Sequence, residues 1–302
     1  MKKSLVALAV FGTLAGTAAA QSSVTAFGVV DVGVRQVKGA IGNQSLLAAD
    51  GSSSSRLGFR GVEDLGGGLK AGFWLEAPLS ADSGTANATR FWDRRATISL
   101  MGDFGEVRMG RHKTSHRLVV DDFDPFSTTG PGAITAIFSG LGSASGVPNR
   151  VDNQVHYILP SSMGGFYGSA DVAAGEGVDG NKTVAGRFGY KAGPLHAAVG
   201  FGSGGAASKY KMMVGAAAYN FGFVNASLMV AQTKFQNRKQ SIWNVGATVP
   251  VGSGALLASY GDSNANNAAE ALSGTGDAKL FVVGYNYNLS KRTALYSLVS
   301  QI

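Results

Sequence analysis

The stretch FWDRRATISLMGDFGEVRMGRH, residues 91–112, decides the fold. Within it Ala96, Ile98 and Leu100 share one parity, and charged or hydroxyl side chains occupy the positions between them. Successive side chains of a strand point to opposite faces, so this pattern predicts a strand with one apolar and one polar face. The turn GDFG and a second alternating segment follow at once, which predicts an antiparallel hairpin.

The segment that follows, residues 112–149, has no sustained periodicity. It carries three aspartates in DDFDPF (residues 121–126) and then a tail rich in Gly, Ser and Ala that includes GLGSASG (residues 140–146). A connection of this length inside a compact domain is usually functional. Alternation resumes in NRVDNQVHY (residues 149–157). We therefore expect an acidic loop between strands whose polar faces carry arginines.

The composition is unusual for a soluble protein. Of 302 residues only 15% are charged, 44 are Gly, and the mean hydropathy is slightly positive. Lys2 and Lys3 precede an apolar run and the sequence Ala18-Ala19-Ala20, which predicts a signal peptide over residues 1–20 and a mature domain over 21–302. The full sequence has 26 basic and 19 acidic residues. Without Lys2 and Lys3 the mature domain has 24 basic residues and a net charge near +5. No later run of 18 apolar residues predicts a membrane-spanning helix, and the absence of Cys fits an exported protein.

Connections between the expected strands alternate between two classes. Seven are tight turns: EDLGGG, GDFG, PSSMGG, KAGP, NFGF, VGSG and NLSK, beginning at residues 63, 102, 160, 191, 220, 251 and 288. Seven are longer and polar, over residues 36–53, 77–90, 112–149, 175–181, 203–208, 236–239 and 262–277. This predicts about fifteen antiparallel strands with every tight turn at one end.

Long alternating strands with short turns on one side and long loops on the other are typical of an all-β transmembrane barrel. A bilayer requires closure, because an open sheet edge leaves backbone N–H and C=O groups without partners. A soluble β-sandwich is the alternative, and it explains neither the signal peptide nor the long strands. The alternation also predicts which side chains point inward: Arg56, Arg60, Lys70, Trp74 and Glu76.

Five segments closely resemble the Gram-negative general porins of the β-proteobacterial type. They are QSSVTAFGVVDVGV (21–34), SSRLGFRGVEDLGGGLKAGFWLE (54–76), RRATISLMGDFGEVRMGRHKT (94–114), NRVDNQVHYILPSSMGGFYGSA (149–170) and YNLSKRTALYSLVS (287–300). The resemblance implies a sixteen-strand outer-membrane barrel, usually a homotrimer, whose third extracellular loop folds into the lumen. It also implies wall arginines that face acidic residues of that loop.

The residue assignments follow from the inward parity and from the resemblance together. We expect the pore constriction to be formed by Arg56, Arg95, Arg150, Asp121, Asp122 and Asp124. Further candidates for the lumen wall are Asp31, Arg60, Lys70 and Arg108. Two alternatives stay open: Arg60 pairs with Glu63 or Asp64 near the turn, and Asp31 pairs with a wall arginine. Arg94 lies on the outward parity, where it would reach for lipid headgroups.

These features predict passive diffusion of ions and small hydrophilic solutes through a water-filled pore, with a preference for anions and without a cofactor. A structural or adhesive barrel and a barrel enzyme are the alternatives. His112 and His116 suggest a zinc site or a Ser–His–Asp triad, but no third ligand is close in sequence and a loop does not supply the geometry. GEGVDGNKT lacks the strand-to-helix context of a phosphate loop.

The expected strand count is odd, although an antiparallel single-chain barrel needs an even number. Related porins continue through one more strand that ends in an aromatic residue, whereas this sequence stops at Gln301-Ile302. We therefore expect a C-terminal strand to be missing and the first and fifteenth strands to have open edges.

Overall fold

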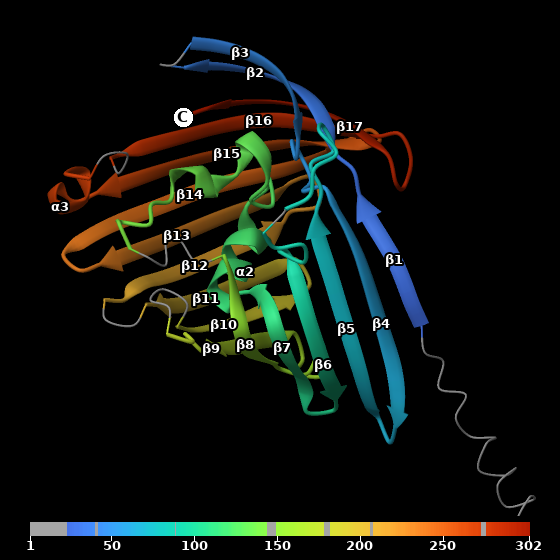
Figure 1. Cartoon of the computed structure of the whole chain (residues 1–302). Helices are drawn as coiled ribbons and strands as arrows, with labels where there is room; N and C mark the ends of the chain where they lie inside the picture. The colour runs from blue at the N-terminus through green and yellow to red at the C-terminus, as the bar shows by residue number, and fades with distance from the viewer. Residues whose placement is uncertain are drawn as a thin grey trace, which may run out of the picture.

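The computed structural model describes residues 23–39, 42–87, 89–143, 149–177, 182–205, 208–272 and 276–302 (Figure 1). The expected signal peptide lies outside these residues. The strands of the main sheet are β1 (Ser23–Val29), β4 (Arg56–Gly66), β5 (Leu69–Pro78), β6 (Arg95–Gly102), β7 (Gly105–Lys113), β8 (Arg150–Ile158), β9 (Phe166–Ala173), β10 (Thr183–Ala192), β11 (Leu195–Gly204), β12 (Tyr210–Asn220), β13 (Asn225–Phe235), β14 (Arg238–Val251), β15 (Gly254–Ala265), β16 (Ala278–Asn288) and β17 (Ala294–Gln301).

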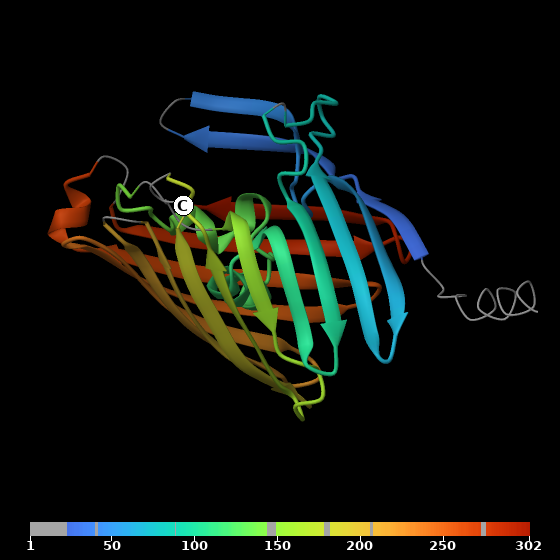
Figure 2. The ribbon, with the colours of Figure 1, turned by 60° about the horizontal axis from the view of Figure 1, so that its bottom comes forward.

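The main sheet is antiparallel and follows the chain order from β1 and β4 to β17. The fold class predicted from the sequence is confirmed, and so is the count of fifteen strands within the described residues. The sheet curls around its own interior (Figures 1 and 2). β1 and β17 form its two ends, run in the same direction, and are not paired with each other.

All seven predicted tight turns connect neighbouring strands of the sheet. One predicted long connection is wrong. β13 ends at Phe235 and β14 begins at Arg238, and these two residues are cross-strand partners. The connection is therefore a two-residue turn, in which Gln236 has a φ of 56°. The polarity of the segment suggested a longer loop, although Asn and neighbouring polar residues also suit tight turns.

The first long connection contains a hairpin of its own, β2 (Val32–Gly39) and β3 (Gly42–Ala49). It projects away from the main sheet (Figure 2). The sequence predicted a long polar connection over residues 36–53, but the first strand already ends at Val29 and β2 begins at Val32.

The long loop between β7 and β8 lies inside the curve of the sheet, as the sequence predicted. It contains the helix α2 (Ser115–Phe123) and two 3-10 turns, η1 (Gly130–Gly132) and η2 (Ile134–Ile137). Another short helix, α3 (Asn267–Glu270), follows β15. No helix within the described residues is long and apolar enough to cross a membrane.

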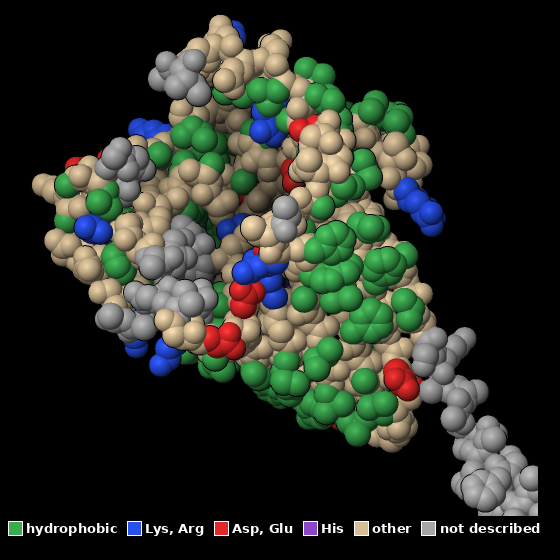
Figure 3. Space-filling view, viewed as in Figure 1, with side chains coloured by type: hydrophobic (Ala, Val, Ile, Leu, Met, Phe, Trp, Pro, Cys, Tyr) green, Lys and Arg blue, Asp and Glu red, His purple; other side chains and the backbone are tan. Residues whose placement is uncertain are grey.

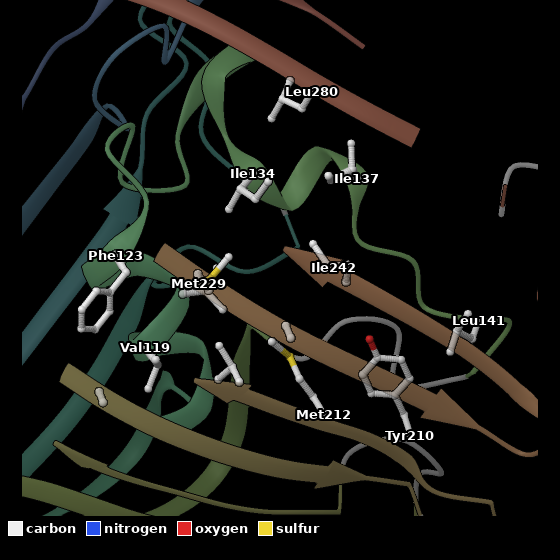
Figure 4. Close-up of a cluster of buried hydrophobic side chains, with 14 of the residues drawn as sticks. Val119, Phe123, Ile134, Ile137, Leu141, Tyr210, Met212, Met229, Ile242 and Leu280 are labelled. Atoms are coloured by element: carbon white, nitrogen blue, oxygen red, sulfur yellow. The ribbon is translucent and has the colours of Figure 1, made fainter. Parts of the chain in front are cut away.

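Hydrophobic packing fixes the loop on one half of the wall (Figure 4). Side chains of the loop bury themselves against the inner face of strands β11–β16; the labelled members are Val119, Phe123, Ile134, Ile137 and Leu141 from the loop and Tyr210, Met212, Met229, Ile242 and Leu280 from the wall. Glycines permit this close approach, since a methyl group at Gly202 would overlap the His116 ring and one at Gly261 would overlap Ile134. The loop is therefore held against this half of the wall.

Candidate pore constriction

A cavity of about 650 Å³ lies between the loop and the wall built by β4, β5 and the start of β8. Charged side chains around a hollow are visible in Figure 3. Six of the charged residues that line the cavity are basic and one is acidic: Arg56, Arg60, Arg94, Lys113, Arg117, Arg150 and Glu76. Low-dielectric walls around an aqueous gap strengthen the field of such a cluster.

Glu76 is the centre of the wall cluster. Its Oε1 accepts a 2.5 Å hydrogen bond from Arg94 Nε and lies 3.8 Å from Arg56 Nε. Trp74 Nε1 donates to Glu76 Oε2 at 3.1 Å. Arg56 also donates from Nη1 to the Ser54 carbonyl at 2.7 Å. One carboxylate thus positions two guanidiniums and neutralises at most one of them.

Arg150 lies at the loop end of β8. Its Nε donates a 2.8 Å hydrogen bond to the backbone carbonyl of Arg94, and the described residues place no carboxylate within ion-pair distance of it. Arg56, Arg94 and Arg150 are therefore brought together on one side of the cavity.

The sequence placed Arg94 incorrectly. The outward parity predicted contact with headgroups, yet the side chain points to Glu76 inside the cavity. The reason is local: β6 begins only at Arg95, so Arg94 belongs to the preceding connection and the strand alternation does not extend to it. Arg95 does not line the cavity. It donates from Nε to Thr97 Oγ1 at 2.9 Å and lies over the Trp74 ring.

Within the residues that the structure describes, none of the three loop acids lines the cavity beside Arg56 and Arg150. Asp121 is bound by Lys113 and by Arg117, whose Nε lies 2.9 Å from Asp121 Oδ1. Thr128 Oγ1 also donates to Asp121. Burial alone would raise the pKa of Asp121, but the two cations and these hydrogen bonds lower it below its usual value. This carboxylate is ionised and already paired.

The other two loop acids point elsewhere. Asp122 reaches the opposite wall, where Arg187 Nη1 lies 3.0 Å from its Oδ2, and burial raises its pKa. Asp124 is buried and accepts backbone N–H bonds from Phe126, Thr128 and Ile134, so it organises the loop itself. The loop presents the hydroxyl-bearing segment Ser127, Thr128 and Thr129 to the cavity instead.

Asp31 does not line the lumen. It is 7% exposed, and its carboxylate accepts bonds from the backbone N–H groups of Gly51, Ser52 and Ser53 and from the Tyr296 hydroxyl. No wall arginine contacts it among the described residues. The inward parity assumed that the first strand continues through Asp31, but β1 ends at Val29 and the first connection folds over this residue.

The three remaining candidates lie nearer the short turns. Arg60 lines the cavity and forms no ion pair with Glu63 or Asp64. Lys70 is exposed at the start of β5, opposite Asp64. Arg108 pairs with Glu106 at 2.9 Å and contacts His112 Nε2 at 3.1 Å, so most of its charge is engaged within the wall.

Comparison with known proteins decides the family. The model of the Gram-negative porins matches residues 4–302. The chain belongs to the Gram-negative porin family. This porin is 39% identical over 320 residues to Outer membrane porin protein 32 of Delftia acidovorans, a match that covers 98% of this chain and 88% of the relative. The fold and residue patterns that predicted a porin are confirmed.

Two solved structures have the same fold as this porin. The anion-selective porin from Comamonas acidovorans superposes with a TM-score of 0.83 at 36% identity, over 92% of this porin and 88% of that chain. OmpT of Vibrio cholerae in its trimer form has a TM-score of 0.68 at 16% identity, over 93% and 88% of the two chains, which shows a shared fold. This porin is an outer-membrane channel for passive diffusion and not an enzyme.

Proposed function

We propose that this porin prefers anions, and that permeating ions pass between the β4–β5 wall and the loop. The observation that carries the proposal is the imbalance of six basic residues against one carboxylate around the cavity. Rings of like charge select ions of the opposite sign. Near a basic cluster, the electrostatic interaction stabilises an anion and destabilises a cation.

The direction of the loop acids supports the proposal. Asp121 is occupied by Lys113 and Arg117, and Asp122 and Asp124 point away from the gap. The wall guanidiniums therefore face hydroxyl groups of residues 127–129. We assign the constriction to Arg56, Arg94, Arg150 and Glu76, with Asp121 as the acid that holds Lys113 and Arg117.

Single-channel recording in planar bilayers tests this assignment. Wild-type porin should give steady ohmic steps, and the double variant R56Q/R150Q should conduct with a lower chloride preference. The control K182Q alters a lysine just before the start of β10, outside the cavity lining, and should leave the preference unchanged. An unchanged preference in R56Q/R150Q contradicts the assignment.

We also propose that the functional unit is a homotrimer in the outer membrane. The support is the trimer form of an outer-membrane protein with the same fold, together with the apolar side chains gathered outside β4 and β5 (Figure 3). The Trp92 ring contacts the rings of both Phe59 and Phe91 there. Light scattering in detergent should give the mass of three chains, and the mass of one chain would contradict the proposal.

A further inference from the structure

Two groups of cations near the cavity differ in what contacts them. Carboxylates hold the first group: Glu76 holds Arg56 and Arg94, and Asp121 holds Lys113 and Arg117. The second group is Arg60 and Arg95. Within the described part of the chain, neither has a carboxylate within ion-pair distance.

An aromatic side chain contacts the second group instead. The Arg95 guanidinium carbon lies 4.4 Å from the centroid of the Trp74 ring, and that of Arg60 lies 5.1 Å from it. Arg60 is also 5.6 Å from the Phe27 ring, which meets Trp74 edge-on at 5.2 Å. A ring face attracts a guanidinium through its quadrupole and leaves the positive charge uncompensated.

The Trp74 ring has a fixed orientation. Its Nε1 donates to Glu76, and Phe27 packs closely over β4, where a methyl group at Gly58 would overlap the Phe27 ring. The ring can therefore hold both guanidiniums in place without a counter-charge.

Arg60 lies further toward the short turns than Arg56, whereas Arg95 lies opposite Glu76 in the strand register. Arg60 follows Arg56 by four positions on β4 toward the short turn, about 13 Å at 3.3 Å per residue. In the strand register Trp74 lies opposite Arg60 on one side and Thr97 on the other.

We propose that Trp74 is a positioning residue for ion selectivity. It holds Arg60 and Arg95 by its ring and so maintains a second step of attraction for small inorganic anions, such as chloride, which extends from the level of Glu76 to Arg60 on the turn side. This inference rests on the proposed anion preference, for which the constriction itself is assigned to Arg56, Arg94, Arg150 and Glu76.

Reversal potentials under a KCl gradient test the role of the ring. In W74L, where no charge changes, the ratio of chloride to potassium permeability should fall by roughly twofold, the size expected for loss of an exposed cation–π contact. W74F keeps a ring face but loses the Nε1–H bond to Glu76, and should retain most of the preference. The matched control W243L alters an exposed tryptophan on β14, outside the cavity lining, and should match wild type.

Each outcome has a distinct meaning. If wild type prefers potassium, the proposed function fails. If wild type prefers chloride and W74L matches it, only the role of Trp74 fails; an equal loss in W74F and W74L would likewise overturn it, since the bond to Glu76 would then be responsible. Should W74L not assemble, R60Q/R95Q removes the two charges and leaves the ring, and a wild-type ratio in that variant overturns the second step.

Discussion

The Tyr296 hydroxyl donates a 2.6 Å hydrogen bond to Asp31 Oδ1, joining residues 265 positions apart. Tyr296 lies on β17, and Asp31 follows β1 at the other end of the sheet. The same carboxylate accepts backbone bonds from Gly51, Ser52 and Ser53. One buried aspartate thus ties the last strand and the first long connection to a common point.

Replacing Tyr296 by Phe should destabilise the folded porin by about 1–3 kcal/mol, because a buried charged acceptor loses its donor. The midpoint of thermal unfolding, followed by the heat-dependent shift in gel mobility, measures this loss. Tyr287→Phe is the matched control, since Tyr287 is exposed on the neighbouring strand β16. Equal midpoints for the two variants would show that the Asp31 contact does not stabilise the fold.

The stability that Asp31 contributes to the folded porin should also depend on pH. Burial alone would raise its pKa, but the bonds from Tyr296 and from the backbone of residues 51–53 lower the net value below the ordinary 3.8. The folded state therefore favours the carboxylate, and this contribution is fully present above the unfolded pKa and lost as the pH falls through the folded pKa. We expect the stability gap between wild type and Asp31→Asn to narrow below about pH 4. A gap that is constant from pH 7 to pH 3 contradicts this.

Packing of the loop gives a third prediction. Ile134 is fully buried between the loop and β15–β16, so Ile134→Ala should cost about 2–5 kcal/mol. In this variant the loop should become more sensitive to protease, and the midpoint of thermal unfolding should fall. Val34→Ala, on the exposed β2–β3 hairpin, is the control and should change neither. A loop that stays resistant in Ile134→Ala would mean that the apolar contact does not anchor it.

The sequence predicted the sheet well because strand alternation is a local property that a membrane enforces along every strand. It predicted Arg56 and Arg150 at the cavity for the same reason. It failed where the chain leaves the strands. Arg94 precedes β6, and Asp124 forms hydrogen bonds within its own loop. The alternation of strand residues therefore predicts the orientation of neither side chain. The burial of Asp31 depends on a partner 265 positions away, which no local pattern contains.

Glu76 offers a test of the charge balance. Glu76→Gln removes the single carboxylate of the cavity lining and should raise the chloride preference, because Arg56 and Arg94 then lack a counter-charge. Glu63→Gln is the control, since that side chain is exposed near the short turn of β4. Reversal potentials compare the variants, and a lower chloride preference in Glu76→Gln would mean that Glu76 acts mainly by positioning the arginines.

The zero-current potential of wild-type porin in a planar bilayer, under a gradient of KCl, tests the central claim most directly. Chloride should be more permeant than potassium, since the cations of the cavity outnumber its carboxylate. The preference should weaken at high ionic strength, where the field of the exposed arginines is screened. The account is contradicted if this potential shows that potassium is more permeant than chloride, measured at low salt in channels that conduct steady ohmic current.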